Sequence, residues 1–102
     1  MNRRKELIDI IWQYIKKYNQ NMKKEASYAY SDLRVTKKEI SESVFYREGE
    51  HRISGEEGNK FSLFFVNYWD GMDSAIDMMD YLGKHGWDAE WYNPGYMVAY
   101  KR

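Results

Sequence analysis

All seven glycines and the single proline of this 102-residue chain lie after residue 48, so nothing in the first half forces the backbone to turn. Apolar side chains there recur at the spacing of one helix face, from Leu7 to Met22. This pattern predicts a helix from about Arg3 to Asn19. A weaker helical pattern continues to Leu33, so we expect one N-terminal helix or a helix pair, with a bend or break at the polar residues 19–21.

Residues 34–43 fit two structures. Thr36 and Glu39 have the spacing of a capping box, which would start a helix. The apolar residues from Ile40 to Tyr46 alternate with polar ones, as in a strand. We favour a strand from about Ser43 onward. The polar, glycine-rich segment 47–60 then predicts turns around a short strand at 51–54.

The segment Phe61–Trp69 is almost entirely apolar and predicts a strand. Its large side chains would occupy both faces, as is typical of a strand that is covered on both sides. We therefore expect either a homodimer or helices on both faces of the sheet, and slightly favour the dimer.

A second amphipathic helix is predicted at about 71–85, after Asp70 as its N-cap and before Gly86 as its terminator. Its core-facing side would carry Met72, Ile76, Met79 and Gly83, with Ala75 and Leu82 beside them.

A C-terminal hairpin is predicted to follow, with strands at about 87–92 and 96–101 joined by a turn at 93–95. In its simplest register, the face toward the core carries a row of large side chains, namely Trp87, Trp91, Tyr96, Val98 and Tyr100. Tyr92 would lie on the other face, near the turn. Together these elements predict a single domain of α+β class, with an antiparallel sheet of four to five strands.

The composition excludes several kinds of chemistry. The chain has no cysteine, which removes disulfides, thiolate metal sites and cysteine nucleophiles. Neither histidine lies in a catalytic or metal-binding motif, and no phosphate-binding glycine loop is present. We therefore expect no catalytic residue, metal or cofactor. Without a signal peptide or an apolar stretch of membrane-spanning length, a cytoplasmic protein is the best fit.

Acidic side chains form the first candidate binding site. Asp70, Asp73, Asp77 and Asp80 are spaced to lie along one stripe of the second helix. Exposed tyrosine and tryptophan dominate the energetics of protein interfaces, and the hairpin offers both beside an acid. The predicted partner-binding residues are Asp70, Asp73, Asp77, Asp80, Glu90, Trp91 and Tyr92, and their charge predicts a partner with a basic surface.

The N-terminal helix suggests a different partner. The net charge is zero, but residues 1–24 contain seven basic and two acidic residues, whereas the rest contains nine basic and fourteen acidic. A basic helix can contact phosphates, so the alternative is a nucleic-acid-binding accessory protein. Its contacts would be Arg3, Arg4, Lys5, Lys16 and Lys17.

Two stretches give the chain a recognisable general character, the opening IIWQYIKKYNQNMKK and the ending WDAEWYNPGYMVAYKR. In these stretches the chain resembles the small cysteine-free inhibitor proteins of phages and mobile elements, including anti-CRISPR and toxin-immunity proteins. The resemblance implies a non-enzymatic inhibitor whose partner would be a nuclease or its effector complex. No functional residue carries over from it, and membrane binding is not expected.

Overall fold

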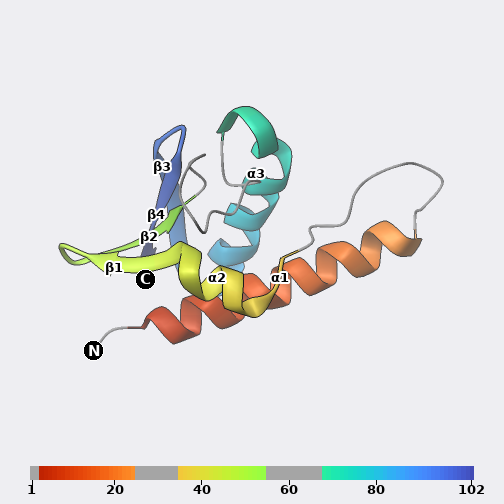
Figure 1. The fold of residues 1–102 in the computed structure, drawn as a ribbon, viewed down its shortest axis with the longest axis horizontal. Coiled ribbons are helices and arrows are strands. Elements are labelled where there is room, and N and C mark those ends of the chain that lie inside the picture. Colours follow the sequence, from red (N-terminus) through yellow and green to blue (C-terminus); the bar gives the residue numbers. More distant parts are fainter. Residues whose placement is uncertain (1–2, 25–34, 55–67) are drawn as a thin grey trace.

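A computed structural model describes residues 3–24, 35–54 and 68–102, and the side chains of residues 3–19, 35–54 and 75–102. The elements follow in the order α1 (Arg4–Lys24), α2 (Lys37–Ser43), β1 (Val44–Arg47), β2 (Glu50–Ser54), α3 (Tyr68–Lys84), β3 (Trp87–Asn93) and β4 (Tyr96–Lys101). The fold is α+β, as predicted, with an antiparallel four-stranded sheet of order β1-β2-β4-β3. Figure 1 shows the sheet at one end of the molecule, with α1 running beneath α3 and beside α2.

Helix α1 is longer than predicted, because it continues through the polar residues 19–21 to Lys24. Asparagine and glutamine weaken a helix by only a few tenths of a kcal/mol each, so without glycine or proline they do not end one. The predicted continuation toward Leu33 falls at 25–34, outside the described residues.

The capping box is confirmed and settles the ambiguity for the described residues 35–43. The Thr36 hydroxyl accepts a hydrogen bond from the Glu39 N–H at 3.2 Å, and the Glu39 carboxylate accepts one from the Thr36 N–H at 3.1 Å. Ile40 therefore belongs to a short helix, and the predicted strand begins at Val44. Strands β1 and β2 are joined by the two-residue turn of Glu48 and Gly49, which both have positive φ, as a tight hairpin turn requires.

The predicted strand at 61–69 is wrong at its end, because Tyr68 and Trp69 are the first residues of α3. Residues 61–67, and with them the rest of that prediction, lie outside the described residues. Because α3 begins two residues before Asp70, this aspartate is not the helix cap. It lies in the first turn, where a negative charge still complements the helix dipole.

The face of α3 that packs on the core is rotated from the predicted one. Ala75, Met78 and Leu82 are fully buried, whereas Ile76 is 43% exposed and Met79 is only partly buried. The helix ends as predicted, with Gly86 at a φ of +87° that a residue with a side chain rarely adopts.

The C-terminal hairpin is present, but its register differs from the predicted one. Trp87 pairs with Lys101 and Trp91 with Met97, whereas Asn93 pairs with Tyr96, so Tyr92 is an extra residue in β3. A one-residue bulge moves every side chain of the facing strand to the opposite face. Met97 and Ala99 therefore point to the core, and the predicted core residue Tyr100 is 43% exposed.

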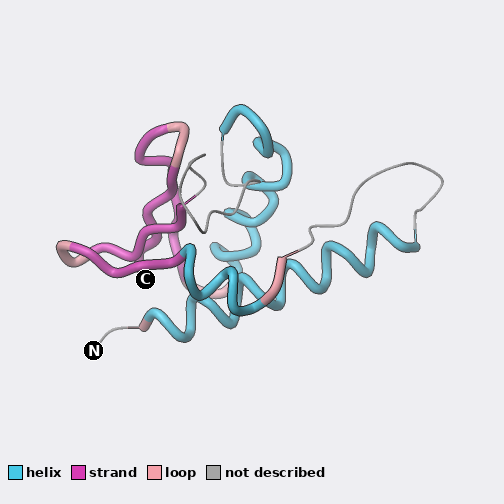
Figure 2. The backbone as a smooth tube through the Cα atoms, in the orientation of Figure 1, coloured by secondary structure: helices cyan, strands magenta, loops and turns pink. Residues whose placement is uncertain are grey.

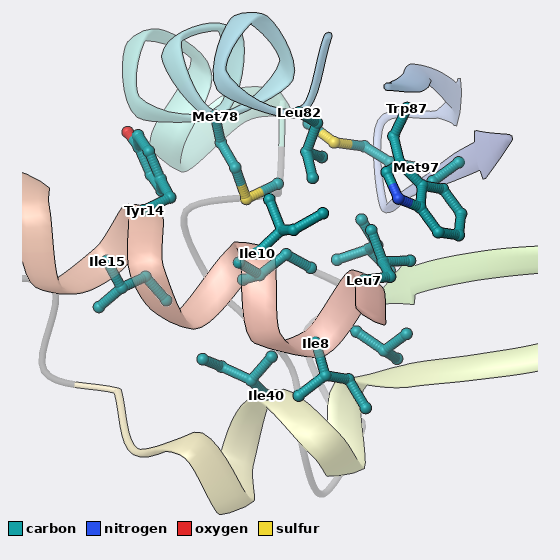
Figure 3. Packing of buried hydrophobic residues seen from close by; sticks show 14 of the residues in the cluster. Leu7, Ile8, Ile10, Tyr14, Ile15, Ile40, Met78, Leu82, Trp87 and Met97 are labelled. Carbon is teal, nitrogen blue, oxygen red and sulfur yellow. The ribbon is translucent and has the colours of Figure 1, made fainter. Parts of the chain in front are cut away.

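One hydrophobic core joins the three helices to one face of the sheet. Figure 2 shows the helices beside the sheet, and Figure 3 shows the buried side chains between them. Trp87 lies at its end and is completely buried, as predicted. We call the sheet face toward this core the inner face and the opposite one the outer face. Val98 is also buried, but on the outer face, between its cross-strand neighbours Arg52 and Glu90.

Candidate protein-binding surface

The predicted partner-binding residues do not form one surface. Asp77 and Asp80 are exposed on α3. Asp70 and Asp73 belong to the same helix, although their side chains are outside the described set. Glu90 and Tyr92 are exposed on β3, whereas Trp91 points inward and packs against the core. The predicted site therefore divides into two parts, the aspartates of α3 and the pair Glu90 and Tyr92 on the sheet, and Trp91 belongs to neither.

Asp77 has a role inside the fold. The hydroxyl of the buried Tyr14 on α1 donates a hydrogen bond to the Asp77 carboxylate at 3.0 Å. Burial, followed by the nearby Asp77 charge, raises the pKa of Tyr14 far above its usual value near 10, so the ring stays protonated and remains a donor. Asp77 thus joins α3 to α1, and it is not simply a solvated member of an acidic stripe.

A groove of about 580 Å³ lies between α3 and β3, and of the predicted partner-binding residues with described side chains only Asp80 lines it. Asp80 and Asp88 line it together with Lys84 and Arg102. The Arg102 guanidinium pairs with Asp88 at 3.2 Å and also donates to the Gly83 carbonyl. Because cations occupy the groove beside its carboxylates, the acidic charge that it presents to a partner is largely compensated.

A better-defined surface lies on the outer face, around the tip of the hairpin. The Tyr92 ring is 66% exposed and stacks on Tyr96 at 5.1 Å between centroids, with an interplanar angle of 15°. The Arg52 guanidinium lies 5.5 Å from the centre of the Tyr96 ring and is paired with Glu50 at 3.3 Å. These side chains form a continuous row of contacts from the hairpin tip to strand β2.

Tyr100 extends this row of side chains toward β1. Burial raises its pKa, with further contributions from the charges of Glu50 and Glu90 and a hydrogen bond to Glu50, so the neutral phenol persists. Phe45 lies on the same face and is 39% exposed. We call this set the tyrosine surface; it consists of Phe45, Glu50, Arg52, Glu90, Tyr92, Tyr96 and Tyr100.

The β3 bulge creates the tyrosine surface. It places Tyr96 and Tyr100 on the outer face, where they join Tyr92, instead of on the inner face with the tryptophans. The turn itself is local, since the Asn93 side chain accepts hydrogen bonds from the N–H groups of Gly95 at 2.7 Å and Tyr96 at 3.2 Å. The sequence pattern predicted Tyr96 and Tyr100 as core residues and gave Arg52 no role, because no sequence signal marks the bulge.

The predicted nucleic-acid contacts on α1 are partly used within the fold. The Arg4 guanidinium donates to the carbonyl oxygens of Val44, at 2.8 Å, and of Ser41. Arg3 pairs with Glu6 at 3.2 Å. Lys5, Lys16 and Lys17 are exposed, and the last two lie over the rings of Trp12 and Tyr81.

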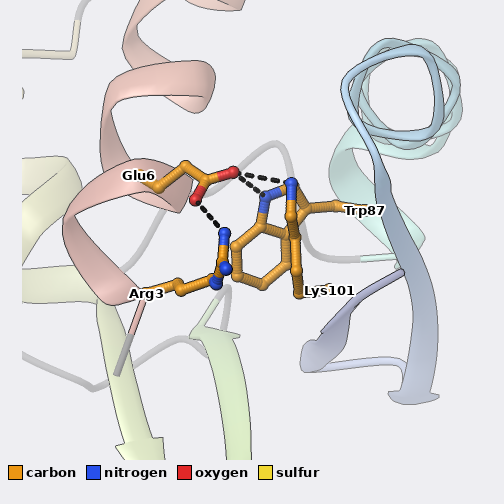
Figure 4. A network of polar contacts seen from close by, with 4 residues as sticks. All are labelled: Arg3, Glu6, Trp87 and Lys101. Atoms are coloured by element: carbon orange, nitrogen blue, oxygen red, sulfur yellow. Dashed lines mark hydrogen bonds and ion pairs between the residues drawn. The ribbon is translucent and has the colours of Figure 1, made fainter. Parts of the chain in front are cut away.

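A polar network closes the end of the core where α1 meets β4 (Figure 4). The Glu6 carboxylate accepts hydrogen bonds from Lys101 at 2.7 Å and from the Trp87 indole N–H at 3.3 Å, and pairs with Arg3. The hydrogen bond from Lys101 is the main reason that the pKa of Glu6 is below its usual value. The network gives the buried tryptophan a hydrogen-bond acceptor and joins the two ends of the chain.

His51 lies on the inner face between Tyr46 and Trp87, at 4.7 and 5.2 Å between ring centroids. Burial lowers its pKa below the usual 6.5, and the positive charge of Arg4 lowers it further. The folded protein therefore favours the neutral ring, whereas the unfolded chain takes up a proton near pH 6.5. His51 therefore contributes to the free energy of unfolding above about pH 6.5, and this contribution is lost as the pH falls below that value.

We accordingly expect the melting temperature to fall between pH 8 and pH 5.5, because protonation of His51 is easier in the unfolded chain. In His51→Gln this part of the pH dependence should disappear. The matched control is His85→Gln, because His85 is exposed near the end of α3. Thermal unfolding of the three proteins across this range is the measurement, and an unchanged pH profile in His51→Gln would contradict the expectation.

The part of the chain that the structure describes contains no cluster of three metal-binding side chains and no helix long and apolar enough to cross a membrane. No protein-family model matches this sequence, and neither a curated protein nor a solved structure shows significant similarity to it.

Proposed function

We propose that this protein acts by binding another protein through the tyrosine surface. The observation that carries the proposal is the Tyr92 ring, a large apolar group that is 66% exposed and yet held in place by its stack on Tyr96. Such a ring loses little conformational freedom on binding, and aromatic anchors of this kind carry much of the energy of protein interfaces.

The charge around the tyrosine surface supports a partner with a basic surface. Glu48, Glu50, Asp88 and Glu90 lie around the rings, against Arg47, Arg52 and the Arg102 that pairs with Asp88, so one negative charge remains in excess. Carboxylates around an aromatic anchor raise the rate of association with a positively charged partner and select against negatively charged ones. This acidic excess supports the finer proposal that the protein antagonises a partner such as a nuclease, whose substrate groove is basic.

The test begins with identification of the partner. A photoreactive phenylalanine analogue replaces Tyr92, the protein is irradiated in an extract of the cells that produce it, and the adduct is analysed by mass spectrometry. The same analogue at Ile76, which is 43% exposed on α3, is the matched control. We expect a protein adduct from position 92 and none from position 76, and the purified adduct protein then serves as the partner.

With the purified partner, Tyr92→Ala should weaken binding about tenfold, because the loss of an interface ring typically costs about 1–2 kcal/mol. Glu90→Lys should lower the association rate, most strongly at low salt. Ile76→Ala should bind as wild type does. Calorimetric titration and stopped-flow mixing measure these effects, and wild-type affinity in Tyr92→Ala would refute the proposed surface. Antagonism is then assayed as inhibition of the partner's own activity.

A further inference from the structure

A second surface of a different character lies between α1 and α2. The two helices form a groove of about 510 Å³ at the base of the molecule, where Figure 1 shows α2 beside the first turns of α1. Its lining residues are Arg4, Lys5, Ile8, Asp9, Lys37, Lys38 and Ser41. Four cationic side chains thus come together from two segments more than 30 positions apart, with a single carboxylate among them.

We propose that this groove binds the phosphate backbone of a single-stranded nucleic acid. Each wall carries a cation that is exposed to solvent, Lys5 on α1 and Lys38 on α2, so an extended polyanion between the helices would be contacted from both sides. Ile8 and the aliphatic parts of the lysines supply an apolar base for the sugars. This site differs from the site predicted on α1 alone. The Arg4 guanidinium is already hydrogen-bonded to two carbonyl groups, and α2 contributes two lysines in its place.

The hydrogen-bonding character of the groove favours nucleic acid over an acidic peptide. Phosphate oxygens only accept hydrogen bonds, and the ammonium groups of Lys5, Lys37 and Lys38 only donate them. An extended peptide would also bring backbone N–H and C=O groups, and the backbone of two helices is already internally bonded. Lys37 is paired with Asp9 at 2.9 Å, a contact that a phosphate can replace while the lysine keeps an anionic partner.

A tryptophan next to the groove favours a single strand over a duplex. Trp12 lies one turn beyond Ile8 on α1, is partly buried, and has the Lys16 ammonium 5.5 Å from its ring centre. A path from Lys5 past Trp12 to Lys16 therefore combines positive charge with an aromatic ring. Single-strand-binding proteins pair cationic tracks with rings on which unpaired bases stack, whereas bases inside a duplex are not available for stacking.

Fluorescence anisotropy with labelled 15-nucleotide single strands of DNA and RNA, and with a DNA duplex, tests the proposal at 25 and 150 mM salt. The groove variant combines Lys5→Glu with Lys38→Glu. Its matched control combines Arg47→Glu with Lys84→Glu, two exposed residues outside the groove that give the same net charge. Circular dichroism and melting temperature establish that both variants are folded.

We expect wild type and control to bind single strands with an affinity that falls steeply with salt, and the groove variant to bind at least about tenfold more weakly at 25 mM. Loss of two phosphate contacts should also reduce the slope of log affinity against log salt by about 1.4.

Equal weakening in both variants would show a general charge effect and overturn the site. Tighter binding of the duplex, or binding of a labelled oligoglutamate peptide in preference to either nucleic acid, would overturn the choice of ligand. Absence of binding at 25 mM would overturn the proposal altogether. Tyr92 and Ile76 are outside the groove, so the outcome is independent of the test of the tyrosine surface.

Discussion

Trp87→Ala should destabilise this protein severely, because it truncates the largest of the fully buried side chains in the described core. The indole packs edge-on against the His51 ring at 5.2 Å and donates to Glu6 at 3.3 Å. Truncation of a buried tryptophan removes its burial energy and leaves a cavity, at a cost of about 3–5 kcal/mol. A domain of this size has about 5–10 kcal/mol in total, so the melting temperature should fall by roughly 15 °C or more.

Two companion variants separate the contributions to this loss. Trp87→Phe retains most of the apolar volume and loses the hydrogen bond to Glu6, so a smaller cost of about 1–2 kcal/mol is expected. Trp91→Ala, at a partly buried position on the same strand, should fall well short of Trp87→Ala. Chemical denaturation with circular dichroism gives the three free energies of unfolding, and a loss below about 1 kcal/mol for Trp87→Ala would contradict its place in the core.

Arg4→Leu is expected to cost about 2–3 kcal/mol, the second-largest effect. Helix α2 has only seven residues, and its last carbonyl groups lack partners within the helix. The Arg4 guanidinium donates to the Ser41 carbonyl in that last turn and to Val44, where β1 begins. Leucine would leave both oxygens without this charged donor, and a hydrogen bond to a charged group contributes about 1.5–3 kcal/mol.

The neighbouring Lys5 provides the control for Arg4. It is exposed on the same helical turn, and Lys5→Leu should change stability by less than about 0.5 kcal/mol. Urea unfolding of both variants measures the difference. If the two substitutions cost the same, Arg4 does not hold α1 to the α2–β1 junction, and its interpretation as a nucleic-acid contact would regain support.

Several elements of the fold are determined by short-range chemistry and could be predicted from the sequence. The Thr36–Glu39 capping box, the left-handed Gly86 and the turn at Asn93 depend on hydrogen bonds or backbone angles within four residues. The burial of Trp87 also follows from the alternation of its own strand. Because these signals are local, they do not depend on how the remainder of the chain packs.

The candidate surfaces, in contrast, were decided by tertiary structure. A single extra residue at Tyr92 costs little locally, but it reverses the faces of β4 and moves Tyr96 and Tyr100 from the expected core to the outer face. The core-facing side of α3 is set by packing against α1 and the sheet, which buries Ala75 and exposes Ile76.

The basic groove shows the same division between sequence and structure. The sequence determined that residues 1–24 are strongly basic, and this charge is independent of the fold. Only the packing of α2 on α1 directed Arg4 to the Ser41 and Val44 carbonyls and brought Lys37 and Lys38 beside Lys5. The physical reason is one of range. Net charge follows from composition, and caps and turns follow from hydrogen bonds between neighbouring residues. A binding surface depends instead on contacts between segments far apart in the chain, and many ways of pairing such segments have nearly equal local energy.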